Sequence, residues 1–232
     1  MGVREAVVLG VATATLGLAT AAVPAQDVAA STGWSAQTHA FAARPPSLHL
    51  GSRGARVRAL QERLIALDYL AGGTADGVFG MRTWHAVVAF QGWQQLHRDG
   101  VVGVGTRSAL AAADPPQAWV RLARGLELDL QRQVLLVVVG GRTVRAVHIS
   151  TARPGYATPR GRFHVYRRER SSWSSAYQVW MPYALYFSGG YAIHGFSSVP
   201  AYPASHGCVR MPLDEAPFVY RATPLRAPVV IR

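Results

Sequence analysis

The residues best suited to carry out chemistry lie in one short stretch of the C-terminal part. Residues 205–210 read Ser-His-Gly-Cys-Val-Arg, and they follow an Ile-His-Gly segment, residues 193–195, after a proline-containing loop. A cysteine thiol becomes a strong nucleophile when a neighbouring imidazole takes its proton or stabilises the thiolate. We therefore predict acyl transfer through a thioester, with Cys208 as the nucleophile and a thiol pKa below the free value of about 8.5.

Two details of this stretch stay open in the sequence. The amide N–H groups of Gly207 and Cys208 are expected to be free to bind a developing oxyanion. Either His194 or His206 could pair with the thiol: His206 is nearer in sequence, but residues two apart on an extended strand share a face without meeting head-on. The alternatives are a zinc site built from both histidines and Cys208, for which no fourth ligand is obvious, and a purely structural turn.

Composition limits the other possibilities. The chain has 232 residues, and its net charge of +12 comes from 24 basic residues, all arginine, against 12 acidic ones. The single cysteine excludes an intramolecular disulfide, a multi-cysteine zinc module and a thiolate-held iron–sulfur cluster. The arginine excess would suit an anionic partner such as nucleic acid, a polyanionic cell wall or a membrane surface. It equally fits a coding bias with most charges on solvated faces, so charge alone names no partner.

The N-terminus has the pattern of an export signal. Residues 1–25 begin with Arg4 and continue with an apolar run from Ala6 to Ala22, shorter than the roughly 20 residues of a membrane span, before small residues. This order predicts a cleaved secretory signal peptide, and the alternative is an uncleaved N-terminal anchor. We expect a secreted protein that acts in the cell wall or periplasmic space.

A linker and a small helical module are predicted next. Residues 26–47 are rich in Ala, Ser, Thr and Gln and show no apolar period, which indicates a flexible linker. Residues 48–113 are predicted to form three helices. The apolar face of the first comprises Val57, Leu60, Leu64 and Leu67. Thr83 and Thr106 are expected to be the N-caps of the second and third.

An internal duplication links the starts of these two helices. Residues 76–83 and 99–106 share Asp, Gly, Val, Gly and Thr in the same order. Asp-Gly favours a tight turn, and the second glycine, Gly80 or Gly103, is expected to tolerate a positive φ. The module resembles the three-helix peptidoglycan-binding module of bacterial wall enzymes, which implies binding to wall glycan or stem peptide, although such modules also serve as spacers. The matching positions include Leu50, Gly51, Gly54, Leu60, Gln61, Tyr69, Phe79, Phe90, Gln91 and Asp99.

Residues 121–232 carry the pattern of a mostly-β domain. Strands are expected over residues 126–130, 134–139, 143–149, 163–166, 179–187 and 229–231. Gly140-Gly141 is expected to form a hairpin turn, and Asp214-Glu215 to open a short helix. The chain is therefore predicted to be multi-domain, with a small three-helix bundle followed by a mostly-β domain.

This C-terminal half resembles the catalytic domain of bacterial L,D-transpeptidases. The family pattern is His-Gly followed by Ser/Thr-His-Gly-Cys-x-Arg/Asn, with Thr-Pro-x-Gly-x-Phe upstream. The corresponding segments are residues 158–163, 181–183, 192–195 and 205–210, together with Phe187. The ten residues between His194 and Ser205 form a shorter loop than in many family members.

The resemblance implies a role for each residue of the site. Cys208 would be the nucleophile, and His194 would be the general base, oriented by the backbone carbonyl of Gly195. The residues expected to shape the pocket and the oxyanion site are Ser205, His206 and Gly207. The residues expected to contact substrate are Arg210, Gly195, Tyr183 and Thr158.

The implied reaction has two steps. Cys208 attacks the carbonyl of the third residue of a peptidoglycan stem peptide and releases D-Ala, and an amine of a second stem then resolves the thioester into a crosslink. The resemblance implies no metal or organic cofactor, and it implies acylation of the same cysteine by carbapenem-type inhibitors. The alternatives are an L,D-carboxypeptidase, in which water replaces the amine, and a wall-binding protein without activity. The predicted export signal and the lack of a nucleic-acid-binding motif argue against nucleic acid, and a membrane contact is expected only through an uncleaved signal segment.

Overall fold

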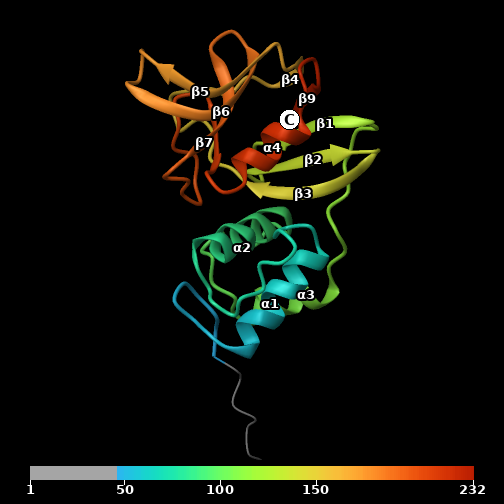
Figure 1. The fold of residues 1–232 in the computed structure, drawn as a ribbon. Helices are drawn as coiled ribbons and strands as arrows, with labels where there is room; N and C mark the ends of the chain where they lie inside the picture. Colours follow the sequence, from blue (N-terminus) through green and yellow to red (C-terminus); the bar gives the residue numbers. More distant parts are fainter. Residues whose placement is uncertain (1–45) are drawn as a thin grey trace, which may run out of the picture. The chain divides into compact units, whose positions relative to one another are not determined.

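A computed structural model describes residues 46–232 and shows helices followed by two sheets (Figure 1). The predicted signal peptide, residues 1–25, and nearly all of the predicted linker, residues 26–47, lie outside the described residues, so both stay predictions. In residues 46–232, no helix is both long and apolar enough to cross a membrane.

Three helices form the first part of the described chain: α1 (Ala55–Ala66), α2 (Met81–Trp93) and α3 (Val104–Ala112). The apolar face predicted for the first helix is confirmed, because its four apolar residues are buried in one core with Phe90 of α2 and Leu110 of α3. Burial of this stripe is what holds such short helices in place, since helices of this length are marginal alone.

A buried glutamine accounts for each copy of the internal duplication. The side-chain amide of Gln61 donates to Asp76 Oδ1 at 2.8 Å and to Thr83 Oγ1 at 2.9 Å, and its oxygen accepts from the amide of Gly77 at 2.8 Å. In the second copy, Gln91 makes the corresponding hydrogen bonds to Asp99, Thr106 and Gly100. The repeated Asp, Gly and Thr are therefore the partners of one glutamine from the preceding helix.

The predicted threonine caps are wrong. The N-caps of α2 and α3 are Gly80 and Gly103, three residues earlier, and the threonine hydroxyls bind the buried glutamines instead. Gly80 and Gly103 have φ of −88° and −78°, so the positive φ expected there is also wrong. The positive φ lies at the glycine of each Asp-Gly turn, Gly77 at 74° and Gly100 at 72°.

The second part of the chain consists of two sheets and one helix. The five-stranded sheet has the order β3-β2-β1-β9-β4, and the four-stranded sheet has the order β5-β6-β7-β8. The elements are β1 (Arg124–Asp129), β2 (Val134–Val139), β3 (Arg142–His148), β4 (Gly161–His164), β5 (Arg167–Ser174), β6 (Val179–Ser188), β7 (Tyr191–Phe196), β8 (Val209–Pro212), α4 (Ala216–Ala222) and β9 (Pro228–Ile231). Neighbouring strands are antiparallel except that β1 pairs with β9, and β7 with β8, in parallel.

All six predicted strands and the short helix are present, and the predicted fold class is confirmed. Strands β5, β7 and β8 were not predicted. Strand β5 is polar or charged along most of its length, so it lacks the apolar alternation that identifies a strand.

Strand β2 is buried on both faces, which explains its continuous apolar sequence. Leu135 and Val137 face the core between the two sheets, to which α4 contributes, whereas Val134 and Leu136 face the core formed by the helices. The helices therefore pack on the outer face of the five-stranded sheet, where Figure 1 shows α2 beside β3. Residues Arg44–Arg232 form one compact unit. The predicted boundaries at 48–113 and 121–232 stay predictions.

Candidate active site

The parallel pair β7–β8 positions the residues expected to carry the chemistry. His194 is aligned with Arg210, and Ile193 with Val209. Because side chains alternate along a strand, Ile193 and Val209 enter the core while His194 and Arg210 point to the opposite face. Cys208 lies two residues before Arg210 and thus on this face, diagonally across from His194.

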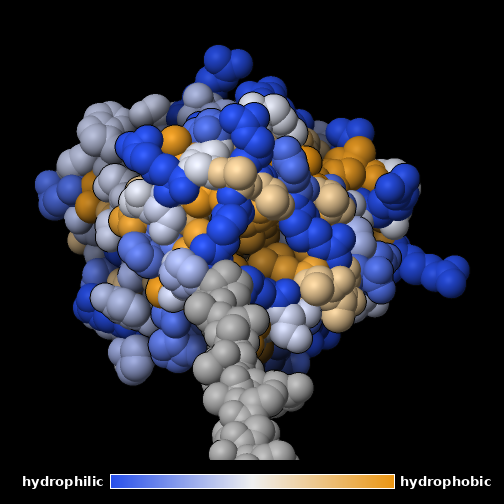
Figure 2. Space-filling model, turned by 90° about the horizontal axis from the view of Figure 1, so that it is seen from below, coloured by the Kyte–Doolittle hydropathy of each residue, from blue (hydrophilic) through white to orange (hydrophobic). Residues whose placement is uncertain are grey.

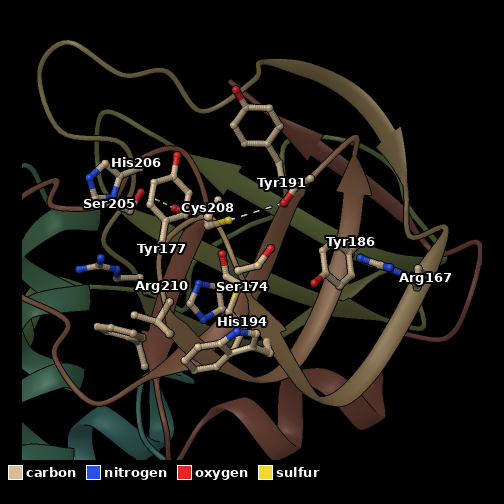
Figure 3. A pocket seen from close by; sticks show the side chains of 17 residues that line it. Arg167, Ser174, Tyr177, Tyr186, Tyr191, His194, Ser205, His206, Cys208 and Arg210 are labelled. Carbon is tan, nitrogen blue, oxygen red and sulfur yellow. Dashed lines mark hydrogen bonds between the residues drawn. The ribbon is translucent and has the colours of Figure 1, made fainter.

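This face forms one wall of a pocket of about 440 Å³. Figure 3 shows Cys208, His194 and Arg210 around one cavity, with Tyr177 and Tyr186 on other sides of it. The residues that line it are Arg167, Trp173–Tyr177, Val179, Met181, Tyr186, Gly190, Tyr191, His194, Phe196, Ser205, His206, Cys208 and Arg210. The size is that of a site for a small molecule or a short peptide.

His194 is held in one tautomer. Its side chain is buried, and Nδ1 lies 2.9 Å from the carbonyl oxygen of Gly195, as the sequence analysis expected. A carbonyl only accepts, so Nδ1 carries the proton and Nε2 presents a lone pair. Burial lowers the pKa of His194 to about 4, and the charge of Arg210 adds to this. His194 is therefore neutral at pH 7 and able to accept a proton.

Cys208 is half-buried, and its thiol lies 3.9 Å from the carbonyl oxygen of Gly190. Burial raises the pKa of the thiol, and the amide of Ala192 and the charge of Arg210 oppose this without reversing it. This is the opposite of the lowered pKa that the sequence analysis predicted. The reason is the burial of the thiol, which disfavours the charged thiolate. The resting pair is thus a thiol beside a neutral imidazole.

The turn before Cys208 is fixed by side-chain hydrogen bonds. Ser205 Oγ accepts from the Gly207 amide at 3.0 Å and donates to the carbonyl of Cys208, while Thr158 Oγ1 donates to the carbonyl of Gly207 at 2.9 Å. Gly207 has φ of +134°, and a Cβ there would lie 2.4 Å from a ring carbon of Tyr191, so only glycine fits.

The expectation that the Gly207 amide is free for an oxyanion is therefore wrong. That amide is used by Ser205 in a local turn of a type that serine and threonine commonly form. The Cys208 amide stays the predicted oxyanion donor from this turn.

His206 lies on another wall of the pocket. Its ring stacks on Tyr177, with centroids 4.4 Å apart, and meets the edge of Tyr156 at 4.8 Å. Tyr177 and Tyr156, which come from two different loops, thus hold the ring of His206 in place. The geometry thus favours His194, on the strand beside Cys208, as the partner of the thiol.

Three residues assigned to substrate binding do not line the pocket. Thr158 is buried, and its hydroxyl also accepts from the amide of Ala152. Tyr183 packs against Tyr220 of α4, with ring centroids 5.6 Å apart. Gly195 lies under α4, where a Cβ would approach Ala216 to 2.9 Å. These three residues therefore lie outside the pocket lining and pack against the elements that carry it.

Arg210 is the cation of the pocket without an acidic partner. Its guanidinium lies over the ring of Phe196, 4.3 Å from the centroid, and no ion pair joins it to a described carboxylate. Burial lowers its pKa, although not enough to remove the charge at pH 7. It is therefore placed to meet an anionic group of a ligand.

The sequence analysis missed strand β5 and its turn into β6, which supply Trp173 to Tyr177. The signal was present: Trp173, Tyr177 and Trp180 stand among polar residues, and all three are exposed in the structure. Exposed aromatic residues grouped in this way are typical of binding surfaces. Within residues 46–232, no three His, Cys, Asp or Glu side chains are grouped as metal ligands.

Comparison with known proteins agrees with this geometry. A family model described as the L,D-transpeptidase catalytic domain matches residues 123–231, and one described as a putative peptidoglycan binding domain matches residues 53–110. The crystal structure of an L,D-transpeptidase (residues 123–326) from Xylanimonas cellulosilytica is 39% identical, with a TM-score of 0.77, over 82% of this chain and 98% of that chain. The chain belongs to the L,D-transpeptidase family.

Two further relatives extend the comparison. An L,D-transpeptidase from Stackebrandtia nassauensis is 25% identical, with a TM-score of 0.51, over 82% of this chain and 97% of that one. A probable N-acetylmuramoyl-L-alanine amidase from Bacillus licheniformis is 40% identical over 72 residues, which are 31% of this chain. The match spans only 20% of that relative's length.

Proposed function

We propose that this L,D-transpeptidase crosslinks peptidoglycan stem peptides through a thioester on Cys208. The observation that carries the proposal is that a half-buried thiol lines the same pocket as a histidine whose Nδ1 is bound to Gly195 and whose Nε2 has no hydrogen-bond partner in the described part of the chain. A nucleophile, a base and a group that orients the base form the arrangement that acyl transfer needs.

In the acylation step, Cys208 Sγ bonds to the carbonyl carbon of the third stem residue while its proton passes to His194 Nε2. Collapse of the tetrahedral intermediate breaks the peptide bond, and His194 returns the proton to the departing D-Ala amine. The raised pKa of the thiol and the low pKa of His194 mean that the proton moves as the S–C bond forms.

In the second step, the amine of another stem gives a proton to His194 and attacks the thioester carbonyl. The C–S bond breaks, and Cys208 recovers its proton. If water takes the place of the amine, the same residues produce an L,D-carboxypeptidase. A carbapenem offers a strained amide to the same sulfur, and we expect it to acylate Cys208.

We also propose that the helical module binds the wall and that the protein is secreted. The family match over residues 53–110 supports the first part, and the sequence of residues 1–25 supports the second. Figure 2 shows apolar side chains among charged ones on the face of the molecule at the helical module. The exposed large apolar residues of this module are Leu50, Met81 and Val104.

Mass spectrometry tests the chemistry. Purified protein is mixed with disaccharide-tetrapeptide beside Cys208→Ala, and the adduct and products are weighed. A thioester adduct with loss of D-Ala, followed by dimer, supports transpeptidation, whereas tripeptide without dimer supports the carboxypeptidase. Turnover that persists in Cys208→Ala would refute the role of this cysteine.

A further inference from the structure

A second pocket of about 340 Å³ lies apart from the catalytic one. Its lining residues are Gln95, Asp129, Gln131, Arg132, Arg160 and Arg232, none of which lines the catalytic pocket. Gln95 follows helix α2, whereas the other five flank strands β1, β2, β4 and β9. Its wall is therefore built jointly by the helical module and the five-stranded sheet.

Arginine side chains outnumber acidic ones in this pocket. Three guanidinium groups share it with one carboxylate, that of Asp129. Asp129 Oδ1 accepts from the amides of Gln131 and Arg132 at 3.0 and 2.9 Å. Its Oδ2 accepts from Arg232 at 2.9 Å and lies 3.7 Å from Arg132 Nε, so one carboxylate is shared by two of the three arginines. Arg160 has no hydrogen bond or ion pair to any of the described residues. Like charges gathered in this way favour a bound anion.

Two of the arginines are held in place before any ligand arrives. The guanidinium of Arg132 lies over Trp93, 4.6 Å from the centroid, and that of Arg232 lies over Trp119 at 3.9 Å. The two indoles stack on each other at 6.4 Å. Groups that are already ordered lose little freedom when they bind.

The two parts of the wall are also in direct contact. Gly92 of α2 approaches the turn that carries Arg132 so closely that a Cβ would lie 2.3 Å from the Arg132 carbonyl oxygen. The position of Gln95 relative to the arginines is thus fixed by backbone contact, not by flexible side chains.

We propose that this pocket is a second substrate subsite, which binds an oxyanion of the cell wall, carboxylate or phosphate. The planar fork of arginine matches both groups in a bidentate manner, and the amides of Gln95 and Gln131 offer further donors. A wall strand held there contacts the helical module and the catalytic domain together. That the oxyanion belongs to the wall rests on the function proposed above, whereas oxyanion binding itself does not.

Direct binding tests the proposal in the full chain carrying Cys208→Ala, which prevents turnover. Inorganic phosphate is titrated by calorimetry, and co-sedimentation is measured with sacculi before and after hydrofluoric acid removes their phosphate polymers. We expect Arg160→Gln to weaken phosphate binding about tenfold, which is the loss expected for one charge-assisted hydrogen bond. Arg132→Gln is expected to do the same, with a melting curve to confirm folding. Arg142→Gln, an exposed arginine of β3 outside both pockets, removes the same charge and is the matched control.

The sacculi identify the source of the oxyanion. A defect of Arg160→Gln that persists on stripped sacculi assigns the subsite to stem carboxylates, and one that disappears assigns it to phosphate polymers. Equal binding of phosphate and sacculi by the parent, Arg160→Gln and Arg132→Gln would overturn the proposal. Thioester formation with soluble tetrapeptide, measured in the Cys208 protein, stays unchanged in the control Arg142→Gln. Phosphate binding without any thioester in that protein would reject the proposed function and leave the anion site standing.

Discussion

Two buried histidines in different regions of the molecule show what separates a catalytic residue from a structural one. His194 on β7 is 3% exposed, and His148 at the end of β3 is 1% exposed. Burial lowers both pKa values, to about 4 and about 3 respectively. Residue type, burial and protonation state therefore do not distinguish them.

The difference lies in which ring nitrogens of each histidine make hydrogen bonds. His148 accepts from Arg98 at Nδ1, 2.8 Å away, and donates from Nε2 to the carbonyl of Val199 at 3.0 Å, so both nitrogens are used. His194 uses only Nδ1 among the described residues, and it lines the catalytic pocket. His148 joins Arg98 of the helical module to the loop between β7 and the catalytic turn, whereas His194 is free to move a proton.

The strongest way to break this comparison is His194→Ala. We expect acylation of Cys208 by disaccharide-tetrapeptide to fall roughly 10²–10⁴-fold, the usual contribution of a general base. The unfolding midpoint is expected to change little by comparison. The matched control is His97→Ala, whose side chain is 89% exposed, and it should react as the parent does. Normal acylation in His194→Ala would remove this histidine from the mechanism.

His148→Ala should have the converse effect. The substitution leaves the guanidinium of Arg98 and the carbonyl of Val199 without their partner, and we expect a loss of roughly 3 kcal/mol in the free energy of unfolding. Urea denaturation measures this loss. Acylation by the folded variant should fall far less than in His194→Ala. A stable His148→Ala protein that no longer acylates would mean that His148, too, is needed for the chemistry.

The pH dependence of stability sharpens the same comparison. The pKa values of His194 and His148 are lower in the folded state than the value of about 6.5 in the unfolded chain, so the unfolded chain binds more protons at mildly acidic pH. Their contribution is complete above pH 6.5 and is lost as the pH falls toward 4. For each such histidine, stability should fall by about 1.4 kcal/mol per pH unit in this window. Urea unfolding at pH 7 and pH 5 checks this, and removal of His148 should flatten the slope.

The sequence predicted the parts of the fold that depend on local pattern. The apolar face of α1, the strand β2 and the glycine turn that follows it were all predicted, because periodicity and turn chemistry depend on neighbouring residues. The short strands β7 and β8 were missed, although they carry the site, because their parallel pairing is a long-range contact that no local pattern records.

The same limit applies to the site. The motif identified Cys208 and the two histidines, and the carbonyl of Gly195 was anticipated. The use of the Gly207 amide by Ser205 was not, since it depends on the path of the turn. The direction of the thiol pKa was also missed, because it depends on how deeply Cys208 is buried and on whether its neighbour is charged.

The pKa of the Cys208 thiol provides the finest test of whether His194 Nε2 is unprotonated in the resting protein. Because burial raises the pKa of the Cys208 thiol, its alkylation by iodoacetamide should have a pH midpoint above the free-thiol value of about 8.5. His194 is neutral near that pH, so His194→Ala should shift the midpoint only slightly while it strongly reduces acylation by substrate. The two rates, measured on the same preparations, separate ionisation of the thiol from proton transfer to the base. A midpoint below the free value that rises in His194→Ala would mean that the resting pair is thiolate and imidazolium. The lone pair on Nε2 would then be occupied at rest, and an unused nitrogen would not be what sets His194 apart from His148.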